Sequence, residues 1–168
     1  MAVMSSPKQS EPSLDDLIAE LRASFPSLTY RTSNRFMWSS SAQVIYYSDH
    51  FKDIQVARQQ LLHETAHALL QHNAYTYDIE LVRIEATAWE RAKILGEEFS
   101  IDIDEDHVQN CLDTYRNWLY KRSACPSCLQ AGLQIDPSTY QCLNCSQTWK
   151  IGPERLCRPY RRYSSLKK

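Results

Sequence analysis

The chain has 168 residues, of which 43% are hydrophobic and 23% charged, and its formal net charge is −1. This length favours one core-forming domain with a small appendage, and the lack of an apolar run of membrane-spanning length excludes an integral membrane protein. The polar N-terminus carries no apolar signal segment, so we expect a cytoplasmic protein without membrane contact, and only three glycines favour helices over a turn-rich β fold.

The first predicted element is a helix that follows a polar segment, residues 1–12, which we expect to be disordered. Ser13 is a typical helix cap, Asp15 and Asp16 supply the acidic first turn, and Pro26 ends the helix. The apolar residues of this segment share one stripe, which predicts a buried face formed by Leu14, Leu17, Ile18, Leu21 and Phe25.

A short β-hairpin is predicted between residues 35 and 47. Two runs rich in aromatic and β-branched residues, 36–38 and 44–47, flank a serine-rich turn. Such runs on both sides of a turn signal are typical of antiparallel strands.

The stretch His63-Glu64-Thr65-Ala66-His67 lies in a helix predicted over residues 51–72. Residues four apart project from nearly the same helix face, about 6 Å apart along the axis, so both imidazoles reach one tetrahedral Zn²⁺. Glu64 lies about 100° around the helix, where its carboxylate can take a proton from a metal-bound water. The pattern indicates a zinc hydrolase, and two ordinary helix histidines beside a surface glutamate are the alternative.

A catalytic zinc needs a third protein ligand, and Glu85 is the strongest candidate. A second helix is predicted over residues 78–96, and Glu85 lies in the middle of its apolar stripe, which consists of Leu81, Val82, Ala88, Trp89, Ala92 and Leu95. A glutamate there is costly to bury unless it is paired or bound to a metal. Because helices joined by a short connection pack antiparallel, Glu85 is expected to return toward His63 and His67. The other candidate ligands are better explained as residues at helix ends or on the surface. They are His50, His72, Asp78, Glu80 and His107.

A fourth helix is predicted after Asp102. Its apolar stripe has the spacing of one helix face and comprises Val108, Cys111, Leu112, Tyr115 and Leu119. Cys111 is expected to be a small core residue.

Four cysteines near the C-terminus have the spacing of a zinc ribbon. Two Cys-x-x-Cys turns, separated by thirteen residues, supply Cys125, Cys128, Cys142 and Cys145. A four-cysteine site is closed, so this zinc is expected to be structural, and a segment of about 28 residues needs it in order to fold. Disulfides are the alternative and fit a cytoplasmic protein poorly. Leu129 and Ser146 stand where glycine often follows such turns, so we expect strain there, and Cys157 is left as a free thiol.

The charge of the chain is unevenly placed. Residues 154–168 contain six basic residues and one glutamate, a net +5, which leaves −6 for the rest. Aromatic residues interleaved with arginines, namely Tyr140, Trp149, Tyr160 and Tyr163, predict nucleic-acid contact through the ribbon and the basic tail. A solvated tail, with Trp149 packed against the ribbon, is the alternative.

These elements predict an α+β protein with four parts. Residues 1–12 form the disordered N-terminus and residues 13–122 a mainly helical metallopeptidase domain with a short hairpin. Residues 123–151 form the ribbon, and residues 152–168 form the basic tail.

Two motifs resemble those of the ImmA/IrrE metallopeptidases. They are His63-Glu64-x-x-His67 with the following Ala-Leu-Leu, and Ile84-Glu85-Ala86-x-x-Trp89-x-x-Ala92. The resemblance covers about residues 30–100 and implies a minimal zincin fold and a zinc endopeptidase that cleaves a protein partner such as a transcriptional repressor. It implies zinc on His63, His67 and Glu85, with Glu64 as the general base.

The chain departs from that family in two ways. It has no room for the helix-turn-helix or sensor domain that many members carry, and it adds the ribbon. Trp89 stands where many glutamate-type zincins have an aspartate, so the partner of the ligand histidines is unassigned. In zincins a strand edge above the active-site helix holds the substrate as an added strand, so the hairpin is a candidate for backbone recognition. An ordinary sheet that caps the helices is the alternative.

Two other functions are weighed against this one. SprT-like proteases, which act at protein–DNA complexes, share the order of an HExxH helix and a zinc ribbon, but their third ligand is a histidine in a His-Gly segment that this chain lacks. A non-catalytic adaptor that binds DNA or protein through the ribbon is the second alternative.

Overall fold

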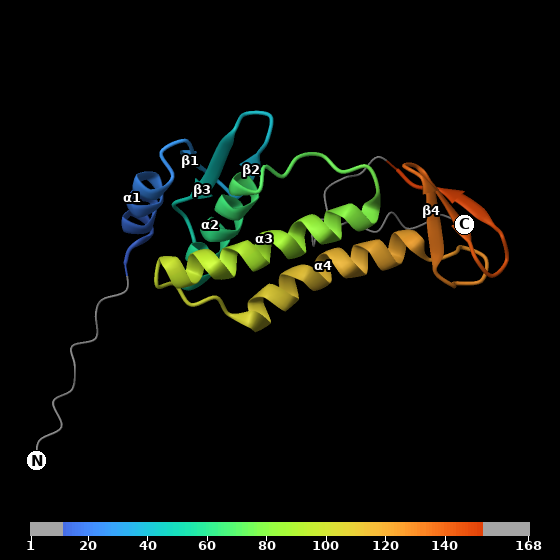
Figure 1. Ribbon diagram of the computed structural model, residues 1–168. Helices are drawn as coiled ribbons and strands as arrows, with labels where there is room; N and C mark the ends of the chain where they lie inside the picture. Colours follow the sequence, from blue (N-terminus) through green and yellow to red (C-terminus); the bar gives the residue numbers. More distant parts are fainter. Residues whose placement is uncertain (1–11, 153–168) are drawn as a thin grey trace, which may run out of the picture. The chain divides into compact units, whose positions relative to one another are not determined.

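The computed structural model describes residues 12–152. This part of the chain is a mixed α+β structure with four helices and two three-stranded sheets (Figure 1), so the expected fold class is confirmed at this level. Its residues form two compact units, one of residues 12–71 with 91–102 and one of residues 72–90 with 103–152. Among the described helices none is both long and apolar enough to cross a membrane.

Helix α1 (Leu14–Ser24) begins at the predicted cap. The Ser13 hydroxyl accepts a hydrogen bond from the Asp16 N–H at 3.1 Å, and the Asp16 carboxylate accepts one from the Ser13 N–H at 3.0 Å. This reciprocal capping box satisfies two N–H groups that lack helical partners. Four of the five stripe residues are buried in the helix, whereas Phe25 lies just past its end, with its ring 6.3 Å from that of Phe99.

The first sheet contains the predicted hairpin and one strand that the sequence did not reveal. Strands β2 (Met37–Ser39) and β3 (Val44–Ser48) pair antiparallel, which confirms the hairpin. Strand β1 (Thr29–Ser33) pairs parallel with β3, so the order is β1-β3-β2 and β2 is an edge strand. Tyr30 of β1 is buried, and its hydroxyl lies 3.2 Å from the hydroxyl of Thr65 on helix α2.

Helix α2 (Ile54–Leu69) is shorter than the predicted 51–72 at both ends. The Asp53 carboxylate caps the N-terminus by accepting from the N–H groups of Gln55 and Val56. Gln71 has a left-handed φ of 56°, a conformation that ends a helix. The remaining helices are α3 (Asp78–Glu98) and α4 (Glu105–Ser123), close to the expected ranges.

Within the second unit the first part of α3 and helix α4 run antiparallel (Figure 1). The start of α3 meets the end of α4, where the Asp78 carboxylate accepts a hydrogen bond from Arg122. The Trp89 ring lies 5.7 Å from the His107 ring near the start of α4.

Two expectations about the burial of residues in α4 are wrong. His107, expected on the surface, is half-buried against Trp89, and Cys111, expected in the core, is only half-buried, with its Sγ 3.6 Å from His107 Nε2.

The second sheet consists of β4 (Gly132–Asp136), β5 (Thr139–Cys142) and β6 (Thr148–Lys150), all antiparallel and in that order. The Tyr140 and Trp149 rings, paired across β5 and β6, stack with centroids 5.6 Å apart. Residue 132 is a glycine because a Cβ there would collide with the Trp149 ring and with the Gln141 carbonyl oxygen.

Candidate metal centres

Helix α2 holds His63 and His67 one turn apart, with both side chains buried. Their Nε2 atoms lie 3.1 Å apart, and their rings are nearly perpendicular, with centroids 4.5 Å apart. A tetrahedral zinc with Zn–N bonds of 2.0–2.1 Å separates two nitrogen ligands by about 3.3 Å. The two histidines therefore already have the spacing of ligands to one ion.

Glu85 completes this group of residues. Its side chain is 7% exposed, and one carboxylate oxygen of Glu85 and one ring nitrogen of each histidine all lie within 4.8 Å of one another. Two imidazoles and a carboxylate are a common donor set of zinc sites that keep one coordination position for water or substrate. These residues thus form a candidate metal-binding group whose chemistry is compatible with zinc.

Glu64 is not a member of the metal-binding group. It is half-exposed on α2, and its Oε2 accepts a hydrogen bond of 2.6 Å from the main-chain N–H of Trp38 on strand β2. Sequence reasoning missed this contact. The short hairpin directly before the helix could have indicated that a strand lies close to Glu64. The donor itself could not be identified from the sequence, because every residue except proline has a main-chain N–H.

The other acidic and histidine candidates lie outside both metal-binding groups of the described residues. His50 is on the surface as expected, with its side chain 93% exposed, and His72 is half-buried with Nε2 3.4 Å from the Thr87 hydroxyl. The Glu80 carboxylate accepts from the N–H groups of Tyr77 and Thr76, and these bonds lower the pKa of Glu80. Glu80 thus stabilises the start of α3, as predicted.

Asp78 lies in the first turn of α3, as predicted, but it also has buried partners outside this helix. It is 3% exposed and accepts from Arg122 Nε at 2.6 Å and from the Tyr140 hydroxyl at 3.0 Å. Its N–H donates to the Gln134 side chain at 2.8 Å, and the Trp149 indole N–H donates to the Arg122 carbonyl at 3.0 Å. The pKa of Tyr140 is raised, mainly because its hydroxyl is buried and secondly because the Asp78 carboxylate lies next to it. The ribbon sheet is therefore fixed to the start of α3 and the end of α4 by a buried polar cluster.

A hydrolytic site would also need a group that stabilises an oxyanion, and the residues near the histidine motif in sequence that could supply it are Tyr46, Tyr47, Tyr75, Tyr77 and His72. Two of these tyrosines already have partners. The Tyr47 hydroxyl accepts from the Thr32 hydroxyl at 3.2 Å, and the Tyr75 ring packs edge-on against Trp118.

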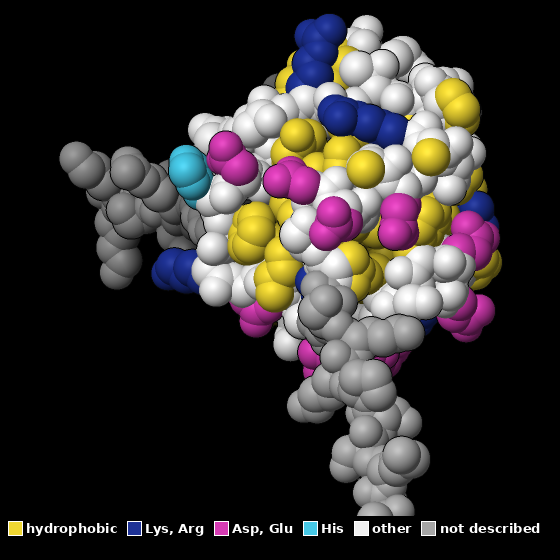
Figure 2. Space-filling model, turned by 90° about the vertical axis from the view of Figure 1, so that its left-hand side faces the viewer, with side chains coloured by type: hydrophobic (Ala, Val, Ile, Leu, Met, Phe, Trp, Pro, Cys, Tyr) yellow, Lys and Arg dark blue, Asp and Glu magenta, His cyan; other side chains and the backbone are white. Residues whose placement is uncertain are grey.

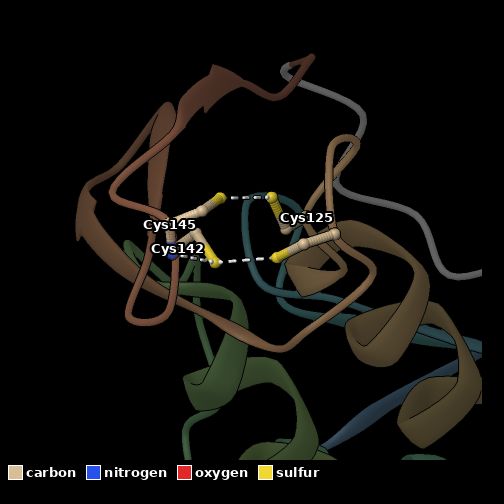
Figure 3. Close-up of side chains that lie close together, drawn as sticks. Cys125, Cys142 and Cys145 are labelled. Atoms are coloured by element: carbon tan, nitrogen blue, oxygen red, sulfur yellow. Dashed lines mark hydrogen bonds between the residues drawn. The ribbon is translucent and has the colours of Figure 1, made fainter.

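The four predicted ribbon cysteines form the second group. Cys125 and Cys145, from opposite turns, face each other in Figure 3 with their Sγ atoms 3.6 Å apart, and the Sγ atoms of Cys128 and Cys142 are 3.5 Å apart. A disulfide would need about 2.05 Å, whereas a tetrahedral zinc with Zn–S bonds of about 2.3 Å separates its sulfurs by about 3.8 Å. The four thiols thus form a second candidate metal site, also compatible with zinc.

The two cysteine turns have the same local design. Main-chain N–H groups of Ser127 and Asn144 point at the Sγ atoms of Cys125 and Cys142, each at 3.4 Å. A hydrogen bond from the Gln130 N–H, and then the Asn144 side chain and the Cys142 thiol, lower the pKa of Cys128 to about 6. These donors favour the thiolate form that binds metals.

Leu129 and Ser146 close these turns with left-handed φ angles of 63° and 60°. These are the two positions at which the missing glycine was expected to cause strain. A side chain in this conformation costs about 1–2 kcal/mol relative to the right-handed one. The ribbon therefore carries strain at both turns.

Figure 2 shows one face of the molecule, on which several carboxylates lie among apolar side chains, with lysine or arginine side chains at the top of the view and at its left edge. On the ribbon, four large aliphatic side chains are exposed, Leu129 at 73%, Leu133 at 58%, Ile135 at 48% and Leu143 at 76%. Tyr140, by contrast, is buried at the helix contact, and Cys157, Tyr160, Tyr163 and the basic tail lie outside the described residues.

Comparisons of the chain with protein-family models, with curated proteins and with solved structures give no match.

Proposed function

We propose that the protein is a zinc-dependent endopeptidase of the minimal zincin type, with His63, His67 and Glu85 as zinc ligands and Glu64 as the general base. One observation carries the proposal: two imidazole nitrogens and a carboxylate oxygen, all from buried residues, lie within 4.8 Å of one another. A buried carboxylate beside two buried imidazoles is costly unless it is paired or holds a cation. The SprT alternative is disfavoured because the third donor is a glutamate.

In the proposed reaction, the zinc ion and Glu64 have separate tasks. Zinc, when bound, supplies a Lewis acid that polarises the scissile carbonyl and acidifies a water. Glu64 accepts the proton of the attacking water and delivers it to the leaving amine. Since Glu64 is outside the ligand group and its Oε1 is left for the water, this role is compatible with its contact to Trp38.

The substrate is proposed to be a protein partner, such as a repressor, bound as an extended segment along the edge strand β2. The ribbon would hold the partner or nucleic acid. Its own candidate zinc has four thiol ligands and no open position, so it would not take part in hydrolysis.

Metal content and cleavage test this proposal together. Purified protein should contain two zinc ions per chain, and a proteome-derived peptide library should be cleaved by the wild type but not by Glu64→Gln, which keeps both ions. Capturing protein partners on Glu64→Gln, followed by mass spectrometry, then identifies the substrate. Retained cleavage by Glu64→Gln would refute the proposal.

A non-catalytic adaptor is the second candidate, favoured by the four exposed aliphatic residues of the ribbon. In that case the protein should hold one zinc ion, lost on mutating the cysteines and retained on mutating the histidines. The Glu64→Gln change should then leave its cellular effect unchanged.

A further inference from the structure

The contact between strand β2 and helix α2 assigns a specific task to a main-chain group. The N–H of Trp38 donates to Oε2 of Glu64 at 2.6 Å, and the two residues are 26 positions apart in the chain. Both belong to the first unit, which also contains His63 and His67.

The direction of this N–H follows from the sheet register. Trp38 lies opposite Ile45 of β3, and β2 is the edge strand of the sheet. Residues along an antiparallel strand alternate between pairs that exchange ladder hydrogen bonds and pairs that do not. Because the Trp38 N–H donates to Glu64, it is directed away from β3. The bond to Glu64 therefore replaces none of the hydrogen bonds between β2 and β3.

A glutamate that acts as a base on a helix surface needs such a support. Its side chain has several rotatable bonds, and the positions of its oxygens are undefined unless a partner holds them. A bond from an N–H to a carboxylate is among the stronger protein hydrogen bonds, and a main-chain donor in a strand has little freedom to move. The bond occupies Oε2, so the other oxygen, Oε1, is left for proton transfer.

We propose that the main-chain N–H of Trp38 is a positioning group for Glu64, so that strand β2 orients the general base as well as lining the substrate site. This inference rests on the proposed function. It predicts that the rate of peptide cleavage depends more on the main-chain N–H of residue 38 than on the side chain of that residue.

Two substitutions at this residue separate the backbone from the side chain. Trp38→Pro removes both the N–H and the indole, whereas Trp38→Ala removes only the indole. Proline is tolerated in edge strands where the N–H is outside the ladder, so Trp38→Pro should fold. On the peptide that wild type cleaves best from a proteome-derived library, Trp38→Pro should lose at least about tenfold more kcat than Trp38→Ala, with similar KM for both, since a positioned base contributes about 10²–10⁴-fold. Equal loss of kcat in both variants, or a loss confined to KM, would overturn the inference.

A second measurement reads the bond without a substrate. In ¹H–¹⁵N NMR spectra of the zinc-loaded full chain, the Trp38 amide proton should be shifted downfield. Glu64→Ala should move it upfield more than any other amide of β2. If wild type cleaves no peptide of the library, the proposed function fails, and this spectrum still decides whether Trp38 holds Glu64. An unchanged Trp38 amide in Glu64→Ala would overturn the contact itself.

Discussion

Removing the Asp78 carboxylate should destabilise the second unit far more than removing an exposed carboxylate. The Asp78 and Arg122 side chains are only 4% and 11% exposed, and the bond between them is 2.6 Å long. Breaking a buried ion pair by deleting one partner costs about 3–5 kcal/mol, because the other charge stays buried. Arg122 keeps the Gly152 carbonyl at 3.2 Å and the Trp118 ring at 4.8 Å, so the lower end of that range applies. The Tyr140 hydroxyl also loses its acceptor, which adds about 1 kcal/mol.

Urea unfolding of the zinc-loaded protein, followed by circular dichroism, measures this loss. With a slope of about 2 kcal/mol/M, a loss of about 3–4 kcal/mol in Asp78→Ala lowers the midpoint by about 1.5–2 M. Asp113→Ala is the matched control, because Asp113 and Arg116 form a 2.8 Å ion pair with side chains 58% and 48% exposed. An exposed pair contributes about 0–1 kcal/mol. The reasoning is refuted if both variants shift the midpoint equally.

Leu129→Gly and Ser146→Gly should each stabilise the ribbon by about 0.5–1 kcal/mol in urea unfolding, because glycine adopts φ near 60° without strain, while Leu143→Gly should not stabilise it. Burial raises the pKa of Tyr30 to about 12, so the native state keeps a proton that the unfolded state loses near pH 10. The free energy of unfolding should therefore fall between pH 10 and pH 12, by about 1.4 kcal/mol per pH unit at most. Measured by urea unfolding at each pH, Tyr30→Phe should abolish this part of the loss. Glu85→Ala should lower the zinc content from two ions to one after dialysis against a weak chelator, and an unchanged content would exclude Glu85 as a ligand.

Local signals in the sequence predicted much of this fold. The Ser13 cap, the hairpin around residues 39–41 and the limits of α3 are encoded by neighbouring residues, because caps, turns and helix stripes depend on residues a few positions apart. The spacing of the four cysteines likewise predicted their cluster. Strand β1 was missed because its parallel partner β3 comes fifteen residues later, and its sequence has a single buried residue, Tyr30.

The candidate site shows the same division between local and distant signals. His63 and His67 share a face through helix periodicity alone, and Glu85 could be singled out because a carboxylate interrupts an apolar stripe. The Trp38 N–H was not predictable, since every residue except proline has that donor. The partners of Asp78 were missed for a related reason: Arg122 and Tyr140 are 44 and 62 positions away, so an acid in a first helical turn had a sufficient local explanation.

The anchoring of the ribbon sheet at Asp78 also affects how deletion experiments should be designed. A shortened protein that ends near residue 122 would deprive the buried Asp78 carboxylate of the Tyr140 hydroxyl and the Arg122 carbonyl of the Trp149 indole. Poor solubility of that fragment, or loss of the proposed hydrolytic activity, would report damage to the start of α3 and would not identify the cysteine segment as a recognition module. Substitutions at the exposed Leu133 or Ile135, which leave the anchor intact, are the better probe of what the segment binds.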